Sequence, residues 1–194
     1  MRRLLNAATD LFGHTDGPTL PGLSSWREAI TPARELDLIG RIEATALSPF
    51  RFQGWLGKRQ TRSYGWTYDF DTGRFAKGEP MPAWLADVRD EVAEMAGLPP
   101  DELAQALLIR YDPGAGIGWH RDRPVFEHVV GLSLGNPATL RFRRRTARGF
   151  ERFSLGAEPR SIYRLSGEAR RDWEHSIAEM DVPRRSITFR TLAP

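Results

Sequence analysis

The residues with the clearest chemical potential in this sequence are His120, Asp122 and His175. His120 and Asp122 are two residues apart, so on a β-strand their side chains would point to the same face. An imidazole nitrogen and a carboxylate oxygen placed side by side can bind one metal ion, and His175 would complete a set of two histidines and one carboxylate. That set leaves open coordination positions on Fe(II) for oxygen chemistry. The pattern predicts an iron-dependent oxygenase, although a His-x-Asp pair alone is also typical of an exposed strand without metal.

A second group of candidate residues closes the sequence. Arg184, Ser186, Thr188 and Arg190 are spaced by two, so on a strand they would share one face. Two arginines on the inner face of a barrel are costly to bury unless an anion meets them. A dicarboxylate such as 2-oxoglutarate would supply that anion, and its keto-acid end could chelate iron. The alternative is that both arginines lie at strand ends and reach solvent.

The elements that must position these residues are short strands preceded by two helices. Thr31-Pro32 is a good helix start, and Pro82 to Ala96 has the apolar spacing of a second helix. Turn sequences rich in Gly, Pro and Asn separate the segments after residue 104. This spacing predicts a mainly β fold, a sandwich or barrel with the helices packed outside it. The strands are expected near residues 106–111, 117–122, 128–134, 138–143, 150–155, 160–165 and 184–191.

Residues 47–79 combine aromatic and basic side chains and are the candidate substrate reader. Aromatic residues alternate through the second half of this segment, which predicts a strand with one aromatic face. Such a face could stack a base while nearby cations bind phosphates. The alternative is that the aromatic side chains only cover the barrel. The aromatic residues of the predicted strand are Tyr64, Trp66, Tyr68 and Phe70, and the cations are Arg51, Lys58, Arg59 and Arg62.

Composition limits the possible classes of protein. The chain has 194 residues, a formal net charge of +3 and no cysteine, which excludes disulfides and thiol chemistry. No apolar run approaches the roughly 18 residues of a membrane span, and Asn6 and Asp10 interrupt a signal-peptide core, so a cytoplasmic location without membrane contact is expected. Nearly all the positive charge is arginine, since lysine occurs only at Lys58 and Lys77. This charge permits a nucleic-acid partner but does not require one, because a compositional bias explains it equally well.

Four ordered motifs together resemble the AlkB family of Fe(II)/2-oxoglutarate dioxygenases. They are Tyr111-x-Pro113-Gly114, His120-x-Asp122, Trp173-x-His175 and Arg184-x-Ser-x-Thr-Phe-Arg190, within residues 105–194. The resemblance implies a double-stranded β-helix, or jelly roll, with outer helices. It also implies Fe(II), 2-oxoglutarate and dioxygen as cofactor and cosubstrates, and oxidative demethylation of alkylated bases in DNA or RNA, as in DNA repair. The base would have to be single-stranded or flipped out of a duplex.

Carried over position by position, the resemblance assigns His120, Asp122 and His175 to iron. Arg184 matches the arginine that pairs with the distal carboxylate of 2-oxoglutarate, and Tyr111 matches the phenol that helps to hold that end. Arg190 matches the second arginine of the closing strand, near the keto-acid end and the iron site. Arg59, Arg62, Tyr64 and Trp66 are the predicted substrate contacts.

Two departures from the family pattern concern Ile109 and Pro124. Repair members have an asparagine where this chain has Ile109, and its loss could weaken cosubstrate affinity by about 1 kcal/mol or more. They also tend to have an acid facing the alkylated base where this chain has Pro124. The same iron chemistry on a protein side chain or a small molecule is therefore the alternative function. A non-catalytic nucleic-acid-binding module is a third possibility, against which the intact ligand set speaks.

The expected organisation is one AlkB-like domain over residues 1–194, monomeric in solution. Residues 1–46 would form an N-terminal arm and outer helix, 47–103 a substrate lid and second helix, and 104–194 the dioxygenase core. A second basic group, from Arg141 to Arg148, spans a predicted strand and its turn. It could contact phosphates, although charged residues also protect an exposed hairpin edge from aggregation.

Overall fold

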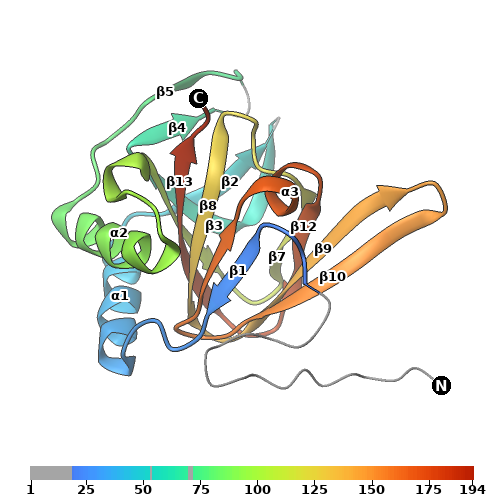
Figure 1. The fold of residues 1–194 in the computed structure, drawn as a ribbon. Coiled ribbons are helices and arrows are strands. Elements are labelled where there is room, and N and C mark those ends of the chain that lie inside the picture. The colour runs from blue at the N-terminus through green and yellow to red at the C-terminus, as the bar shows by residue number, and fades with distance from the viewer. Residues whose placement is uncertain (1–18, 53, 70–71) are drawn as a thin grey trace.

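Two sheets form the body of the protein. The computed structural model describes residues 19–52, 54–69 and 72–194. The larger sheet has seven strands and the smaller has four, and a separate two-stranded hairpin lies beside them (Figure 1). In spatial order the larger sheet consists of β1 (Leu23–Trp26), β11 (Ile162–Leu165), β8 (Phe126–Gly135), β13 (Arg184–Leu192), β6 (Gln105–Tyr111), β3 (Trp55–Tyr64) and β2 (Ser48–Phe52).

The four-stranded sheet carries two of the candidate metal ligands, His120 and His175, on neighbouring strands. Its strands in order are β10 (Gly149–Ala157), β9 (Ala138–Thr146), β12 (Glu174–Met180) and β7 (Ala115–His120). The hairpin consists of β4 (Trp66–Tyr68) and β5 (Phe75–Lys77). An inner apolar cluster joins the two sheets, with Tyr111 and Val129 from the larger sheet and Phe142 and Ile177 from the smaller.

Two helices cover the outer face of the seven-stranded sheet (Figure 1). The first, α1 (Pro32–Ala44), begins where the Thr31 hydroxyl accepts a hydrogen bond from the Arg34 amide, as the Thr-Pro sequence predicts. The second, α2 (Ala83–Ala96), ends at Gly97 in the left-handed region. A 3₁₀ turn (Pro100–Glu102) follows α2, and the short α3 (Gly167–Arg171) precedes β12.

Alternation along β13 separates the two cores. Ile187 and Phe189 face the helices and are fully buried there. Arg184, Ser186 and Arg190 alternate with them and face the space between the sheets. The predicted mainly β fold, a double-stranded β-helix with outer helices, is confirmed by this layering.

The predicted single strand through Tyr64, Trp66 and Tyr68 is wrong. β3 ends at Tyr64 and β4 begins at Trp66, because Gly65 between them has a φ of +76°. A Cβ at Gly65 would lie 2.1 Å from the Ala104 carbonyl oxygen, so the chain can bend there only at a glycine. Phe70, the fourth member of the predicted alternation, lies outside the described residues.

Other differences concern element ends and missed strands. The strand predicted over 117–122 ends at His120, so Asp122 lies beyond it. β12 was not predicted, and residues 166–167 begin α3 rather than forming only a turn. Of the predicted N-terminal arm and outer helix over residues 1–46, residues 1–18 lie outside the described part of the chain, whereas β1 begins at Leu23 and pairs with β11.

Candidate metal and cosubstrate site

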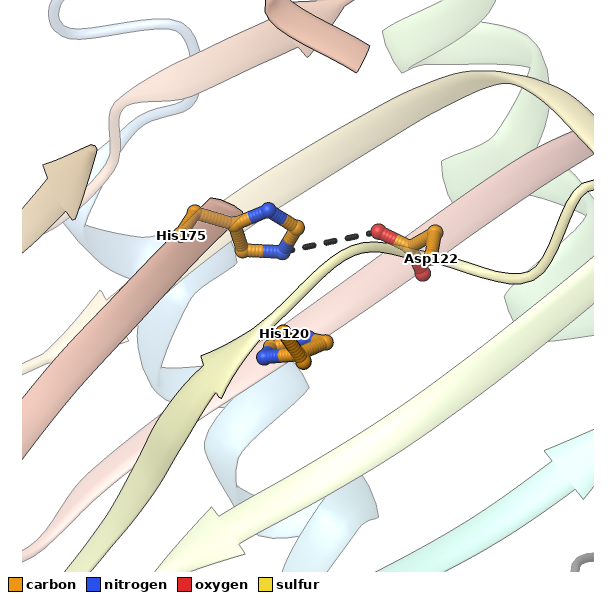
Figure 2. Close-up of side chains that lie close together, drawn as sticks. All are labelled: His120, Asp122 and His175. Atoms are coloured by element: carbon orange, nitrogen blue, oxygen red, sulfur yellow. Dashed lines mark ion pairs between the residues drawn. The ribbon is translucent and has the colours of Figure 1, made fainter. Parts of the chain in front are cut away.

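Two strand ends and one short segment bring His120, Asp122 and His175 together (Figure 2). His120, the last residue of β7, is the cross-strand partner of His175 on β12, and their ring centroids are 4.3 Å apart. Asp122 follows two residues after His120. One candidate ligand atom from each residue lies within 4.8 Å of the others. The three side chains therefore have the chemistry and the spacing to hold one metal ion.

The Asp122 carboxylate has one occupied and one free oxygen. Its Oδ1 accepts a hydrogen bond of 2.8 Å from Arg190 Nε, while Arg190 Nη1 donates to Gln105 Oε1. Its Oδ2 lies 3.5 Å from His175 Nε2 and is buried without a hydrogen-bond partner. The side chain is only 7% exposed, so an unpaired carboxylate oxygen there is costly. A cation between Oδ2 and the two imidazoles would satisfy it.

The two histidines are set up as neutral ligands. Burial lowers the pKa of His175 to about 3, with the neighbouring His120 adding to the effect. Burial also lowers the pKa of His120, although Asp122 opposes this shift. His120 Nδ1 lies 2.9 Å from the Gly118 carbonyl oxygen, which can only accept, so the proton sits on Nδ1 and Nε2 is left with its lone pair.

The carboxylate, by contrast, stays ionised. Burial alone would raise the pKa of Asp122, but the Arg190 guanidinium and the two imidazoles outweigh burial and hold that pKa well below its usual range. An ionised carboxylate beside two neutral imidazoles has the protonation that divalent metal binding needs.

A buried arginine holds the segment that carries Asp122. Arg170, on α3, donates through Nη2 to the carbonyl oxygens of Arg123 and Phe126, the latter at 2.6 Å. Because β7 has already ended, no strand partner fixes residues 121–125. Sequence reasoning missed Arg170, since one arginine among several on a short helix gives no signal.

A second buried charge lies deeper between the sheets. Arg184 is 1% exposed, donates to Ser133 Oγ at 2.9 Å, and has its guanidinium carbon 5.4 Å from the centre of the Tyr111 ring. No carboxylate among the described residues pairs with it, and its Nε has no hydrogen-bond partner. A buried cation without an acidic partner is costly unless an anion binds to it. The alternative prediction, that Arg184 reaches solvent at a strand end, is excluded by this burial.

Tyr163 is a further polar residue between the sheets that was not predicted from the sequence. It pairs across the sheet with Gly131, and a Cβ at Gly131 would lie 2.4 Å from the Tyr163 hydroxyl, so the glycine makes room for the phenol. Burial raises the pKa of Tyr163 to about 12, even though Arg184 opposes the shift. The phenol therefore keeps its proton and can donate. Ile109 faces the same space and adds no polar atom.

The four predicted substrate contacts separate into two pairs. Arg59 has its guanidinium 3.7 Å from the centre of the Phe50 ring, and its charge lowers the pKa of His120. Arg62 instead donates to Glu79 at 2.6 Å, and Tyr64 is 9% exposed within the core that faces the helices. The structure therefore does not bring Arg62 and Tyr64 to the metal ligands, because both lie on the opposite face of β3.

Trp66 belongs to an aromatic row that leads to the candidate metal site. Its ring stacks on Phe75 at 4.7 Å, and Phe75 meets Phe126 edge-on at 5.8 Å. The Arg190 guanidinium, which holds Asp122, lies 5.3 Å from the Phe126 ring. Phe75 belongs to the aromatic segment over residues 47–79, whereas Phe126 was not predicted, because it lies on a distant strand that only the fold brings beside Phe75.

The chain was compared with known proteins. Residues 42–190 match the family model described as the 2OG-Fe(II) oxygenase superfamily. A tRNA (carboxymethyluridine(34)-5-O)-methyltransferase, alkbh8, of Xenopus tropicalis is 29% identical over 166 residues, covering 82% of this chain and 26% of that protein. An "Alkylated DNA repair protein ALKBH8 homolog" of Arabidopsis thaliana is 26% identical, covering 81% of this chain and 51% of that protein. The chain thus spans only about a quarter to a half of these relatives.

Solved structures with the same fold are more distant in sequence. OsALKBH1 is 17% identical with a TM-score of 0.68, covering 90% of this chain and 99% of that chain. A Pseudomonas putida prolyl-4-hydroxylase is 16% identical with a TM-score of 0.58, covering 89% of this chain and 93% of that one. Among the described residues, no helix is both long and apolar enough to cross a membrane.

Proposed function

Because the chain belongs to the 2OG-Fe(II) oxygenase superfamily, as an AlkB-like 2-oxoglutarate-dependent dioxygenase, we propose that it oxidatively removes alkyl groups from bases in DNA or RNA. Fe(II), 2-oxoglutarate and dioxygen together supply the oxidation, in which 2-oxoglutarate gives succinate and carbon dioxide while a substrate C–H bond becomes C–OH. When that carbon is an N-alkyl group, the hydroxylated product releases an aldehyde and the free base nitrogen. The chain's own residues bind and orient the reactants.

His120, Asp122 and His175 would hold the iron. The buried Oδ2 of Asp122 supports this assignment most directly, because it lies beside ligand-ready imidazoles and has no hydrogen-bond partner. Arg190 would keep the carboxylate ionised and turned toward the metal through its hydrogen bond to Oδ1.

Arg184 would bind the distal carboxylate of 2-oxoglutarate. The support is its burial without an acidic partner, since a planar guanidinium can donate two parallel hydrogen bonds to a carboxylate. Tyr111 and Tyr163 would add phenol donors, and Ser133 orients the guanidinium through Nη2. Tyr163 would in this way supply a polar contact where Ile109 offers none.

The aromatic row Trp66, Phe75 and Phe126 is the observation that favours a base as substrate. The half-buried rings of Trp66 and Phe75 can stack a base that has left its duplex or was never paired, while the buried Phe126 connects them to Arg190. Arg59 on the neighbouring lid strand can meet a phosphate. The names of the relatives, which refer to tRNA and to alkylated DNA, agree with this class.

Formaldehyde release from methylated oligonucleotides tests the proposal. The protein with Fe(II) and 2-oxoglutarate should release formaldehyde from single-stranded DNA or RNA that carries N-methylated bases, and Asp122→Ala should abolish the release. Asp112→Ala is the matched control, because Asp112 pairs with Arg110 at 3.0 Å and is not a candidate ligand. Succinate formation that no methylated oligonucleotide stimulates at low salt would contradict a nucleic-acid substrate.

The alternative is the same oxidation of a protein side chain or a small molecule. Pro124 favours it, because the chain offers no carboxylate at the position where repair members of the family have an acid. Stimulation of succinate formation by a peptide or metabolite fraction, and by no oligonucleotide, would support this second function.

A further inference from the structure

The outer face of the four-stranded sheet carries a group of arginines around two aromatic rings. The face lies on β7, β9 and β10, and the β9–β10 hairpin extends away from the rest of the molecule (Figure 1). None of these residues belongs to the candidate metal and cosubstrate site. We call this group the arginine face, and its members are Trp119, Arg141, Arg143, Arg145, Phe150 and Arg152.

Strand alternation explains why these residues share one face. Phe142 and Phe153 are cross-strand partners that point into the inner core, so Arg143 and Arg152, the next pair along, point outward. Phe150 and Arg145 form a further outward pair of the same ladder.

The rings and guanidiniums of the arginine face alternate in space. The Arg143 guanidinium lies 4.4 Å from the centre of the Trp119 ring and 4.7 Å from that of Phe150. Arg145 and Arg152 each lie 5.6 Å from the centre of the Phe150 ring. Phe150 is 38% exposed and so offers part of its ring to a partner.

The charge of the arginine face is largely uncompensated. Arg143 donates to Glu174 at 2.6 Å, whereas Arg141 donates to the neutral Ser176 hydroxyl at 3.1 Å and has no acidic partner in the part of the chain that the structure describes. Arg145 and Arg152 have no acidic partner among the described residues. The four arginines of this face and the single carboxylate of Glu174 leave an excess of three positive charges. This excess equals the formal net charge of the entire chain, +3.

On the opposite face of the same hairpin, by contrast, the positive charge is compensated by acidic residues. Arg144 points inward and pairs with both Glu151 and Glu168, each at 2.8 Å. Protection of an edge from aggregation would explain exposed charges. It does not explain an exposed phenylalanine at their centre, because an apolar ring there favours association.

We infer that the arginine face binds single-stranded nucleic acid, with its guanidiniums on backbone phosphates and with bases stacked on Phe150 and Trp119. Guanidiniums pair with phosphate in a planar, two-pronged way, and aromatic rings accept any base. The inference rests on the proposed function and extends it, since the bound strand would be the substrate outside the reacting nucleotide.

The position of the arginine face agrees with this role. Trp119 precedes His120 on β7, so the outer ring and the inner candidate ligand lie on opposite sides of one strand. β7 is the edge strand of its sheet and contacts β3, the lid strand that carries Arg59. A strand of nucleic acid that follows the arginine face reaches the metal site by passing around this single edge.

Binding of unmethylated oligonucleotides tests the inference separately from catalysis. The probes are fluorescein-labelled single-stranded DNA and RNA of about 12 nucleotides, read by fluorescence anisotropy at several salt concentrations. Arg145→Gln/Arg152→Gln should weaken binding about tenfold and reduce the slope of log K against log salt by about 1.4, or about 0.7 for each lost phosphate contact. Arg27→Gln/Arg89→Gln removes the same charge elsewhere and is the control.

The stacking of bases on Phe150 is tested by a separate measurement. Phe150→Leu should weaken binding of the ordinary probe about fivefold and leave binding of a probe with abasic sites unchanged. The inference would be overturned if the wild-type protein and Arg145→Gln/Arg152→Gln bound the oligonucleotide with equal affinity and equal salt slope. It would also be overturned if polyglutamate bound as tightly as the oligonucleotide, which would indicate an acidic protein partner instead.

Failure of this inference is distinguishable from failure of the proposed function. If the wild-type protein demethylates oligonucleotides while the double variant binds them normally, only the inference falls. If the wild-type protein binds no oligonucleotide and releases no formaldehyde, both fall.

Discussion

The two carboxylate oxygens of Asp122 have different surroundings, and this difference is the central feature at the scale of single residues. Oδ1 is occupied by Arg190 and Oδ2 is free beside the imidazoles. A hydrogen bond to the first oxygen fixes the orientation of the second, as partners of metal ligands generally do.

Arg190→Met tests this orienting role. The variant should bind Mn(II) about 10- to 100-fold more weakly, because Asp122 loses the charge that keeps it ionised and turned. Isothermal titration with Mn(II) measures the effect. Arg185→Met is the control, since Arg185 lies on the same strand, β13, but donates to Glu43 on α1, away from the metal ligands. An unchanged Mn(II) affinity in Arg190→Met would show that the carboxylate needs no such support.

Arg184→Met should change stability and cosubstrate affinity in opposite directions. Without cosubstrate, removing a buried cation that has no acidic partner should raise the free energy of unfolding by about 1 kcal/mol. The dissociation constant for 2-oxoglutarate should rise about 100-fold through loss of charge-assisted hydrogen bonds. Urea denaturation and calorimetric titration of the Mn(II)-loaded protein measure the two quantities. A variant that is less stable and binds 2-oxoglutarate normally would assign Arg184 a purely structural role.

At the scale of elements, the bend at Gly65 separates the β4–β5 hairpin from the larger sheet. β3 pairs with β6 in the larger sheet, whereas β4 and β5 pair only with each other, so Gly65 decides where the aromatic row begins. The positive φ and the nearby Ala104 carbonyl oxygen leave no space for a side chain.

Gly65→Ala and Gly40→Ala should therefore have opposite effects. Gly65→Ala should lower the free energy of unfolding by about 1–3 kcal/mol, since the new Cβ meets backbone. Gly40 lies within α1 with nothing near its missing Cβ, so Gly40→Ala should raise the free energy of unfolding by about 0.5–1 kcal/mol. Chemical denaturation compares the two. Equal effects would mean that the bend at Gly65 carries no strain for alanine.

The elements that sequence reasoning predicted are those with regular local signals. The Thr-Pro start of α1 and the Gly97 end of α2 are local signals, and the start of α1 and both ends of α2 were predicted nearly to the residue. β12 was missed because its register shifts twice against β7, which breaks the alternation of apolar residues. Tyr163 and Arg170 were missed for a related reason: their roles depend on residues far away in the sequence, Gly131 and the carbonyl of Phe126.

At the scale of the whole molecule, folding places ionisable groups where water cannot reach them. An unfolded chain would expose His175 with an ordinary pKa near 6.5, whereas burial in the native state lowers the pKa of His175 to about 3. Between these values the unfolded state binds a proton that the native state does not, so stability falls as the pH falls through this window.

The metal-free protein should consequently lose about 2 kcal/mol of unfolding free energy from His175 between pH 7 and pH 5. Burial lowers the pKa of His120 as well, which adds to the loss. Urea denaturation at several pH values measures this slope, and His175→Gln should flatten it. A His175→Gln variant with the wild-type slope would mean that other groups dominate the acid response.

The motifs were sufficient to predict the fold class and the family of this chain, but not the sheet order. His-x-Asp and the arginine pair identify chemistry that only a narrow set of folds supports. The pairing of β1 with β11 and of β3 with β6 depends instead on contacts between distant segments, for which a single sequence has no local signal.

The direct pairing of His120 with His175 limits how the length of this chain can change. One residue inserted within β7 ahead of His120 would turn that imidazole to the outer surface, because successive side chains alternate. The turn between β9 and β10 lies at the far end of a projecting hairpin, and no candidate ligand depends on it. Insertions and deletions should therefore be tolerated at the tip of the β9–β10 hairpin, whereas they should not be tolerated within β7.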